Sequence, residues 1–201
     1  MILLRLKLDG ELMIKRLCFD MESSYFKDPL SGVGEVESHR EYMREKVTKH
    51  GPIRFDCAVV YDDKDREYLE FQYNQAAAPV DLLETADELI SRSGKRHDLL
   101  VLEQVCGEVR VAPLWQLTHY DLFDLCNWSS LDNLARHYIP VDRLCEIKRA
   151  HENRLNQADE RWPEEWPNFR PPEHFIEKRL SKARFDVERT YLVFEAYLAA
   201  Q

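Results

Sequence analysis

The sequence predicts an α/β protein in which helices flank a mixed β-sheet. Three short stretches in the first third of the chain, 15–20, 54–61 and 67–71, are rich in the apolar, β-branched and aromatic residues that favour strands. Later stretches, above all 173–200, repeat apolar residues at helical spacing instead. Strands followed by several helices are typical of a sheet covered by helices. The 201 residues show no internal repeat and no change of composition, so we expect a single domain.

The predicted strands come first along the chain. Residues 15–20 (KRLCFD) form an apolar run that ends in acids, which indicates a buried strand with polar groups at its C-terminal end. The connection 23–53 is polar, and we expect one helix in it at about 38–48. Residues 54–61 and 67–71 are expected to pair as a hairpin, because the acidic turn sequence DDKD lies between them.

The predicted helices follow. Pro79 is expected to open a helix that extends to about Ser91, because proline is tolerated in the first helical turn. A second helix is expected from Asp98 to Val105, and a short strand at 108–112. Further helices are expected at 130–138, 141–158 and 173–200. Two segments complete the expected layout, a leading extension at 1–12 before Met13 and an ordered surface loop rich in Pro and Trp at 159–173.

Composition narrows the classes of function. The net charge of −9 argues against a broad, non-specific grip on nucleic acid, but not against an enzyme whose acids are neutralised by bound metal. No apolar run is long enough to span a membrane, and the charged start of the chain does not fit a secretory leader. The five cysteines are scattered and never form a CxxC pair, which favours a cytoplasmic location over a disulfide framework or a zinc site. The sequence patterns of P-loop NTPases, serine hydrolases and HExxH zinc proteases do not occur.

The triplet Asp20-Met21-Glu22 is the most informative feature. Residues two apart on a strand point to the same side, so this spacing places two carboxylates side by side. Their burial is costly unless a cation lies between them, and carboxylate oxygens suit Mg²⁺ or Mn²⁺. Taken alone, the same triplet is also typical of a solvated strand end.

Two later acids lie in a context that strengthens the metal hypothesis. Asp98 begins the apolar helical stretch HDLLVLE, where it serves at least to stabilise the first helical turn. Asp186 lies within the last predicted helix between Phe185 and Val187, at the border of its apolar stripe. Together with Asp20-x-Glu22, these positions give three acidic motifs in a fixed order.

That order resembles the DEDD 3′–5′ exonuclease group of the RNase H-like superfamily, over roughly residues 14–200. FDME at 19–22, HDLLVLE at 97–103 and DVERT at 186–190 are similar to the three motifs of that group, although the Asn and Phe often found ahead of the second Asp are missing. The resemblance implies an RNase H-like fold and two divalent ions, Mg²⁺ or Mn²⁺, one activating a water and the other stabilising the leaving 3′ oxygen. The implied ligands of these ions are Asp20, Glu22, Asp98 and Asp186.

One departure from that pattern concerns the attacking water. The group places a Tyr four residues, or a His five residues, before the last Asp, and this chain has Lys182 and Ser181 there. A Lys of ordinary pKa stays protonated, so Lys182 is a candidate catalytic residue only as a cation that holds a phosphate or the water. The alternative for Lys182 is a solvated helix residue. His174 is a further candidate for the missing role, although a lone His near the start of a helix is more often a surface residue.

Several residues are candidates for contact with substrate. Arg96 lies with Arg92 and Lys95 in a small basic cluster that either contacts a phosphate backbone or solvates a turn. Trp162 and Trp166 either stack on nucleobases or anchor the proline-rich loop to the core. Four further residues are weaker candidates. His119 and Tyr120 are either groups behind the site or, as we favour, loop residues with satisfied hydrogen bonds, and Asp121 and Asp124 are expected to cap helix ends rather than to bind metal.

The function expected from these features is metal-dependent 3′–5′ exonuclease activity on DNA or RNA, with single-stranded 3′ ends as substrate. The alternative is a catalytically weak or inactive RNase H-like module that binds nucleic acid or a protein partner. A third hypothesis is an unrelated α/β domain whose acids lie on the surface and far apart.

Overall fold

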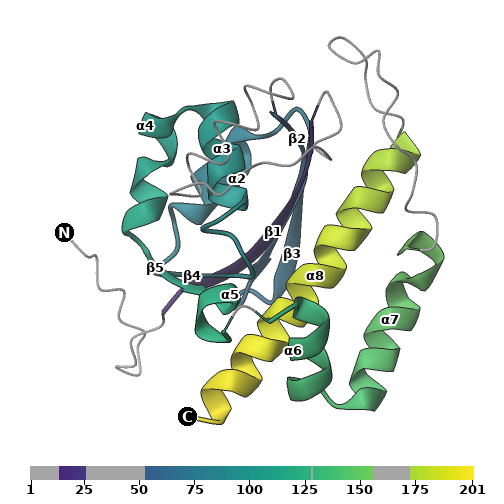
Figure 1. The fold of residues 1–201 in the computed structure, drawn as a ribbon. Helices are drawn as coiled ribbons and strands as arrows, with labels where there is room; N and C mark the ends of the chain where they lie inside the picture. Colours follow the sequence, from purple (N-terminus) through teal and green to yellow (C-terminus); the bar gives the residue numbers. More distant parts are fainter. Residues whose placement is uncertain (1–13, 26–52, 128, 156–172) are drawn as a thin grey trace, which may run out of the picture.

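The computed structural model describes residues 14–25, 53–127, 129–155 and 173–201, and these form a sheet flanked by helices (Figure 1). Within this part of the chain the sheet has five strands in the order β3-β2-β1-β4-β5. β1 to β3 pair antiparallel, whereas β1, β4 and β5 run parallel. The predicted α/β class with a mixed sheet is therefore confirmed. The strands are β1 (Arg16–Tyr25), β2 (Ile53–Asp62), β3 (Glu67–Gln72), β4 (Glu88–Ser91) and β5 (Thr118–Asp121).

Helices cover both faces of the sheet, with α6, α7 and α8 on one side and α2 and α3 on the other (Figure 1). The long helix α8 lies along β1 and β2 and contacts α6 and α7. The helical segments are α2 (Ala77–Leu83), α3 (Asp98–Cys106), α4 (Glu108–Val111), the 3₁₀ helix η1 (Ala112–Gln116), α5 (Leu122–Leu125), α6 (Leu131–Tyr138), α7 (Val141–Leu155) and α8 (Glu173–Ala199).

The alternation of β1 residues between the two faces sets the position of the acids. Leu17 and Phe19 are fully buried in the core under α2 and α3, and Cys18 is buried in the core under α8. Because successive residues of a strand point to opposite faces, Asp20 and Glu22 follow Cys18 onto the α8 face. The carboxylates thus occupy two positions that would otherwise continue the apolar core.

β1 is longer than the sequence predicted. The acids were expected at its end, but the strand continues to Tyr25 because β2 pairs with it along its length, with Asp20 opposite Val59 and Glu22 opposite Cys57. On its other side β1 pairs with β4 only from Arg16 to Cys18. The acids therefore lie just beyond the point where β4 ends, and this leaves space beside them.

The prediction of one helix from Pro79 to Ser91 was wrong. α2 ends at Leu83, and residues 88–91 form the inner strand β4, whose Leu89 and Ile90 are fully buried. A short apolar run that is buried on both faces has the same pattern as a buried helix segment, and only the sheet partners decide between them.

The strand expected at 108–112 was also wrong, because this segment forms α4 and the start of η1. The edge strand β5 was missed. It has only four residues, and its sequence THYD carries little of the apolar signal of a strand.

The strands at 54–61 and 67–71 and the helices at 98–105, 130–138 and 173–200 are confirmed, within one or two residues at their ends. The helix from residue 141 is confirmed as far as Leu155. No helix within the described ranges is both long and apolar enough to cross a bilayer. The predicted extension at 1–12, the helix at 38–48 and the loop at 159–172 lie outside the described residues.

Candidate metal site

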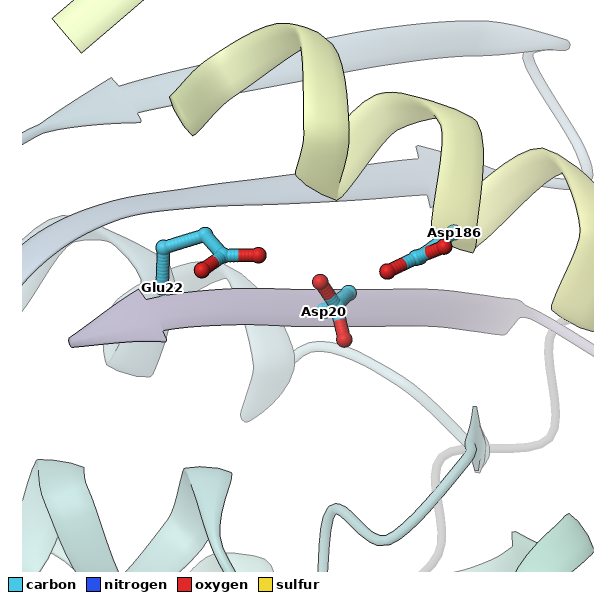
Figure 2. Close-up of side chains that lie close together, drawn as sticks. All are labelled: Asp20, Glu22 and Asp186. Atoms are coloured by element: carbon cyan, nitrogen blue, oxygen red, sulfur yellow. The ribbon is translucent and has the colours of Figure 1, made fainter. Parts of the chain in front are cut away.

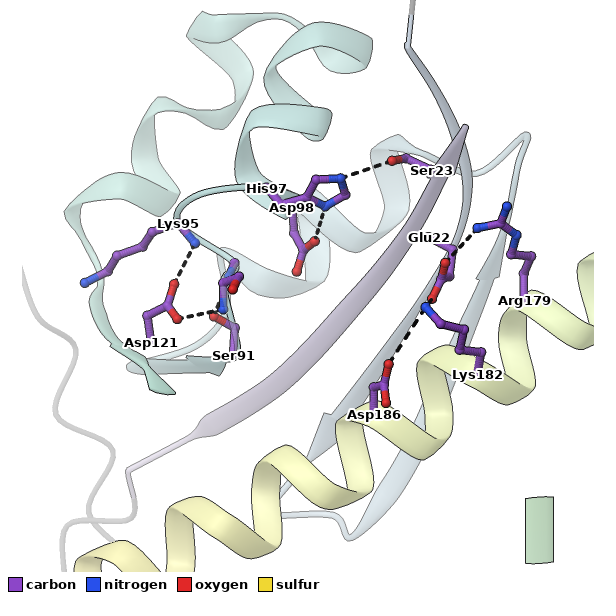
Figure 3. A network of polar contacts seen from close by, with 12 residues as sticks. Glu22, Ser23, Ser91, Lys95, His97, Asp98, Asp121, Arg179, Lys182 and Asp186 are labelled. Carbon is purple, nitrogen blue, oxygen red and sulfur yellow. Dashed lines mark hydrogen bonds and ion pairs between the residues drawn. The ribbon is translucent and has the colours of Figure 1, made fainter. Parts of the chain in front are cut away.

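A cavity of about 520 Å³ opens beside β1, where β4 ends. β1 supplies Asp20 and Glu22 to its wall, α3 supplies Asp98, and α8 supplies Lys182 and Asp186. Figure 3 shows how these side chains enter from α3 and from α8 on either side of β1. The C-terminal ends of parallel strands are the usual place for a site in an α/β sheet, since helices and loops diverge there.

Three carboxylates meet in this cavity. Asp20, Glu22 and Asp186 each offer an oxygen, and these oxygens all lie within 4.8 Å of one another (Figure 2). Because β1 and α8 are far apart in sequence, only the packing of the helix on the sheet brings Asp186 to the pair on the strand. The hypothesis of scattered surface acids is therefore contradicted for these three residues.

Asp98 lies on the same cavity but outside that group of three. It is the first residue of α3, and its side chain is nearly completely buried. Its Oδ1 is 2.9 Å from Nδ1 of His97, whose Nε2 is 3.3 Å from Oγ of Ser23, while its buried Oδ2 has no hydrogen-bond partner (Figure 3). Buried polar atoms are nearly always satisfied, so an orphaned carboxylate oxygen on a cavity wall indicates a missing ligand.

Burial and mutual repulsion disfavour the charged forms of two of the acids. Burial raises the pKa of Asp20 well above its usual range, and the charges of Asp98, Asp186 and Glu22 raise it further, against the opposing charge of Lys182. Burial also raises the pKa of Asp98, although the hydrogen bond from His97 works against this. Repulsion of this kind is relieved when a cation binds between the carboxylates.

Glu22 is neutralised by two cations of α8. Nη1 of Arg179 lies 2.7 Å from its Oε2, and Nζ of Lys182 contacts its Oε1 (Figure 3). The same Nζ is 3.9 Å from Oδ2 of Asp186. Burial lowers the pKa of Lys182, but the charge of Glu22 outweighs it, so that the pKa is raised and the amine stays protonated. Lys182 thus contacts the carboxylate cluster while its side chain stays 49% exposed, so the interpretation of it as a solvated helix residue agrees with its exposure but leaves out its ion pairs.

Two arginines of the site were missed by the sequence analysis. Arg179 pairs with Glu22, and Arg189 pairs with both Asp186 and Asp132. The spacing of α8 contains a signal for them, because residues 179, 182, 186 and 189 recur at intervals of three and four on one face of the helix. Three basic residues around one acid on a single helical face indicate an acidic partner opposite.

The donor set fits a divalent cation. Asp20 has no hydrogen bond or ion pair within the described part of the chain, and Asp98 keeps one oxygen without a partner. These hard oxygen donors suit Mg²⁺ or Mn²⁺. Glu22 differs, since both of its oxygens already contact cations.

Of the other candidates for substrate contact, Arg96 lies away from the cavity. Arg96 pairs with Asp124 at 2.7 Å and packs over the ring of Phe123. It does not line the cavity, whereas its neighbour Arg92 does. Trp162, Trp166 and the side chain of His174 lie outside the described residues.

Asp121 and His119 support the loop behind the site. Asp121 caps α5 by accepting from the backbone of Phe123, as predicted, and also accepts from the backbones of Ser93 and Lys95 (Figure 3). His119 lies 2.7 Å from Oγ of Ser91, and burial lowers its pKa to about 3, so the ring stays neutral.

Comparison with known proteins finds similarity to solved structures. No family model matches the chain, and no curated protein matches it. The structure is similar to that of the family B DNA polymerase from the hyperthermophilic archaeon Pyrobaculum calidifontis, with a TM-score of 0.53 and 13% sequence identity. The match covers 92% of this chain and 25% of the polymerase, so the chain spans about a quarter of its length. At this identity the similarity concerns the fold alone, a mixed five-stranded sheet with flanking helices that is consistent with an RNase H-like fold.

Proposed function

We propose that the protein is a divalent-metal-dependent 3′–5′ exonuclease that acts on DNA or RNA. The observation that carries the proposal is the convergence of acids from β1, α3 and α8 on one cavity, in the motif order of the DEDD group. The fold shared with part of a DNA polymerase supports an association with nucleic acid. The 3′–5′ direction follows from the resemblance of the motifs.

Different residues of the cavity would serve different steps of phosphodiester hydrolysis. A bound divalent ion would lower the pKa of a water and stabilise the leaving oxygen. Asp20 and Asp98 would hold it, because both line the cavity and Oδ2 of Asp98 has no hydrogen-bond partner. Arg92, Lys182 and Arg189 also line the cavity, and these cations would balance charge in the transition state. Because the acids of the cavity outnumber its cations, the cavity would attract the phosphate of a strand end only with a divalent ion bound.

One observation favours the second candidate, a catalytically weak RNase H-like module. From α8 the described cavity lining receives Lys182, Asp186 and Arg189, and neither an imidazole nor a phenol. Ser181, at the other position where the DEDD group has a water-orienting residue, is buried. The attacking water would therefore be oriented by cations and carboxylates alone, and we expect slow turnover.

An oligonucleotide assay separates the two candidates. Single-stranded DNA and RNA, labelled at either the 3′ or the 5′ end, are incubated with Mn²⁺, Mg²⁺ or EDTA. We expect stepwise shortening from the 3′ end with Mn²⁺, none with EDTA, and loss of activity in Asp20→Asn. Asp142→Asn, which changes an exposed carboxylate in the first turn of α7, is the matched control and should stay active. If wild type and Asp20→Asn bind the oligonucleotide and are equally inert with every metal, the exonuclease proposal fails and the binding module remains.

A further inference from the structure

We propose that the site holds one divalent ion, between Asp20 and Asp98, and that the ammonium of Lys182 replaces the second ion between Glu22 and Asp186. This inference rests on the proposed function and departs from the two ions that the resemblance implies. It assigns to Lys182 a role that its position in the motif does not suggest.

The place of a second ion is filled by the chain itself. Glu22, Asp186 and Asp20 offer oxygens close enough to share one cation. Nζ of Lys182 contacts Glu22 and lies 3.9 Å from Asp186, so it already bridges two of the three (Figure 3). Lys182 is one turn ahead of Asp186 on α8, so its contact with Asp186 follows from the helix geometry, whereas its contact with Glu22 follows from the packing of α8 on β1.

Further ion pairs hold Glu22 and Asp186 in this arrangement. Arg179 takes the second oxygen of Glu22, and Arg189 contacts the other oxygen of Asp186. A divalent ion would have to compete with four ion pairs to take both acids as ligands. The same acids therefore have little left to offer to an added metal.

Asp20 and Asp98, by contrast, have no such set of ion pairs to cations in the part of the chain that the structure describes. No ion pair or hydrogen bond to Asp20 occurs within the described residues, and Asp98 is nearly completely buried with an oxygen that has no partner. Each is near enough to the other for their charges to interact. This unsatisfied pair is the part of the cavity that a cation completes.

The charges around the cavity agree with a single ion. Five carboxylates line it (Asp20, Glu22, Asp98, Asp132 and Asp186), against three lining cations (Arg92, Lys182 and Arg189) and Arg179, which binds Glu22. With all of these groups charged, the acids exceed the bases by a single charge. One divalent ion more than neutralises this excess, whereas two would leave a strongly positive cavity.

Mn²⁺ binding by the full chain tests the inference, with stoichiometry measured by isothermal titration calorimetry and equilibrium dialysis. We expect one ion in the wild type, two in Lys182→Met, and one in Lys182→Arg, which keeps the charge. Lys148→Met removes an exposed lysine of α7 and should leave one ion. Thermal unfolding of each variant shows whether it is folded.

The affinity for Mn²⁺ should depend on Asp20 and Asp98 more than on Glu22. Asp98→Asn and Asp20→Asn are expected to weaken binding at least tenfold, and Glu22→Gln less than threefold. Two ions in the wild type, or one ion in a folded Lys182→Met, would overturn the inference and leave the proposed exonuclease intact, because that proposal requires metal dependence and not a stoichiometry. No ion in any variant would overturn both.

Discussion

Replacing Asp98 by asparagine is expected to stabilise the metal-free protein and to destabilise it relative to wild type once metal is bound. Asp98 is only 3% exposed, and its Oδ2 has no partner. An unsatisfied buried polar atom costs about 1–3 kcal/mol, and more when charged. The asparagine removes the charge and its repulsion with Asp20 and still accepts from His97. We therefore expect a gain of about 1–2 kcal/mol in unfolding free energy, or roughly 2–8 °C in Tm.

Saturating Mn²⁺ should make the wild type more stable than Asp98→Asn. A ligand present at about 100 times its Kd stabilises the folded state by about 2.7 kcal/mol, and the variant that has lost the site gains little of it. The wild type should then be the more stable protein by about 1 kcal/mol. Chemical denaturation monitored by circular dichroism, with EDTA and with Mn²⁺, measures both differences.

Asp121→Asn is the matched control for this prediction. Asp121 is as buried as Asp98, but its carboxylate accepts from the backbone N–H groups of Ser93, Lys95 and Phe123. Its replacement should destabilise the protein by about 1–3 kcal/mol with or without Mn²⁺. If Asp98→Asn is the less stable protein in EDTA, or if Mn²⁺ shifts it as much as the wild type, Asp98 is not an unsatisfied metal ligand.

Three further predictions concern the surroundings of the site. The pKa of His119 is lowered to about 3, so the folded state binds fewer protons than the unfolded state below about pH 6.5. The free energy of unfolding should therefore decrease as the pH falls from there, by at most about 1.4 kcal/mol per pH unit. Urea denaturation from pH 7 to 4 should show this slope, and His119→Gln should reduce the slope. Gly94→Ala should destabilise the protein by about 1–3 kcal/mol, because the added Cβ would lie too close to Oγ and to Cβ of Ser91, the latter at 2.7 Å. An unchanged midpoint of chemical denaturation would contradict this geometry. Arg92→Ala should weaken oligonucleotide binding measured by fluorescence anisotropy, because Arg92 lines the cavity. The variant should also lower the slope of the logarithm of the binding constant against the logarithm of the salt concentration by about 1. An unchanged slope would show that Arg92 does not contact a phosphate.

Local patterns predicted much of the fold and the pairing of acids on the first strand. The alternation of β1 places Asp20 and Glu22 on one face, and the apolar repeat of α8 places Asp186 toward the sheet. These features depend only on residues near in sequence, so a periodicity is enough to recognise them.

The position of the cavity could not be predicted in the same way. It depends on where β4 ends, and residues 88–91 have the apolar pattern of a helix as much as of a buried strand. Their identity as a strand is decided by pairing with β1, about 70 residues earlier, and with β5. The ion pairs of Glu22 with Arg179 and Lys182 join residues more than 150 positions apart, so a local sequence pattern could not predict them either.

The basic face of α8 and the missing water-orienting residue have one physical explanation. Lys182 occupies the position where the DEDD group has a Tyr, and that position lies within reach of Glu22 because α8 packs along β1. A neutral phenol there would leave the repulsion between Glu22, Asp186 and Asp20 to be balanced by metal. A protonated amine balances part of it permanently, at the cost of a group that orients water. In the proposed exonuclease this lysine would therefore exchange dependence on a second ion for slower chemistry, and Lys182→Tyr should shift the protein in the opposite direction, toward binding of two ions and faster turnover. A Lys182→Tyr variant that binds one Mn²⁺ and degrades a 3′-labelled oligonucleotide no faster than wild type would contradict this coupling.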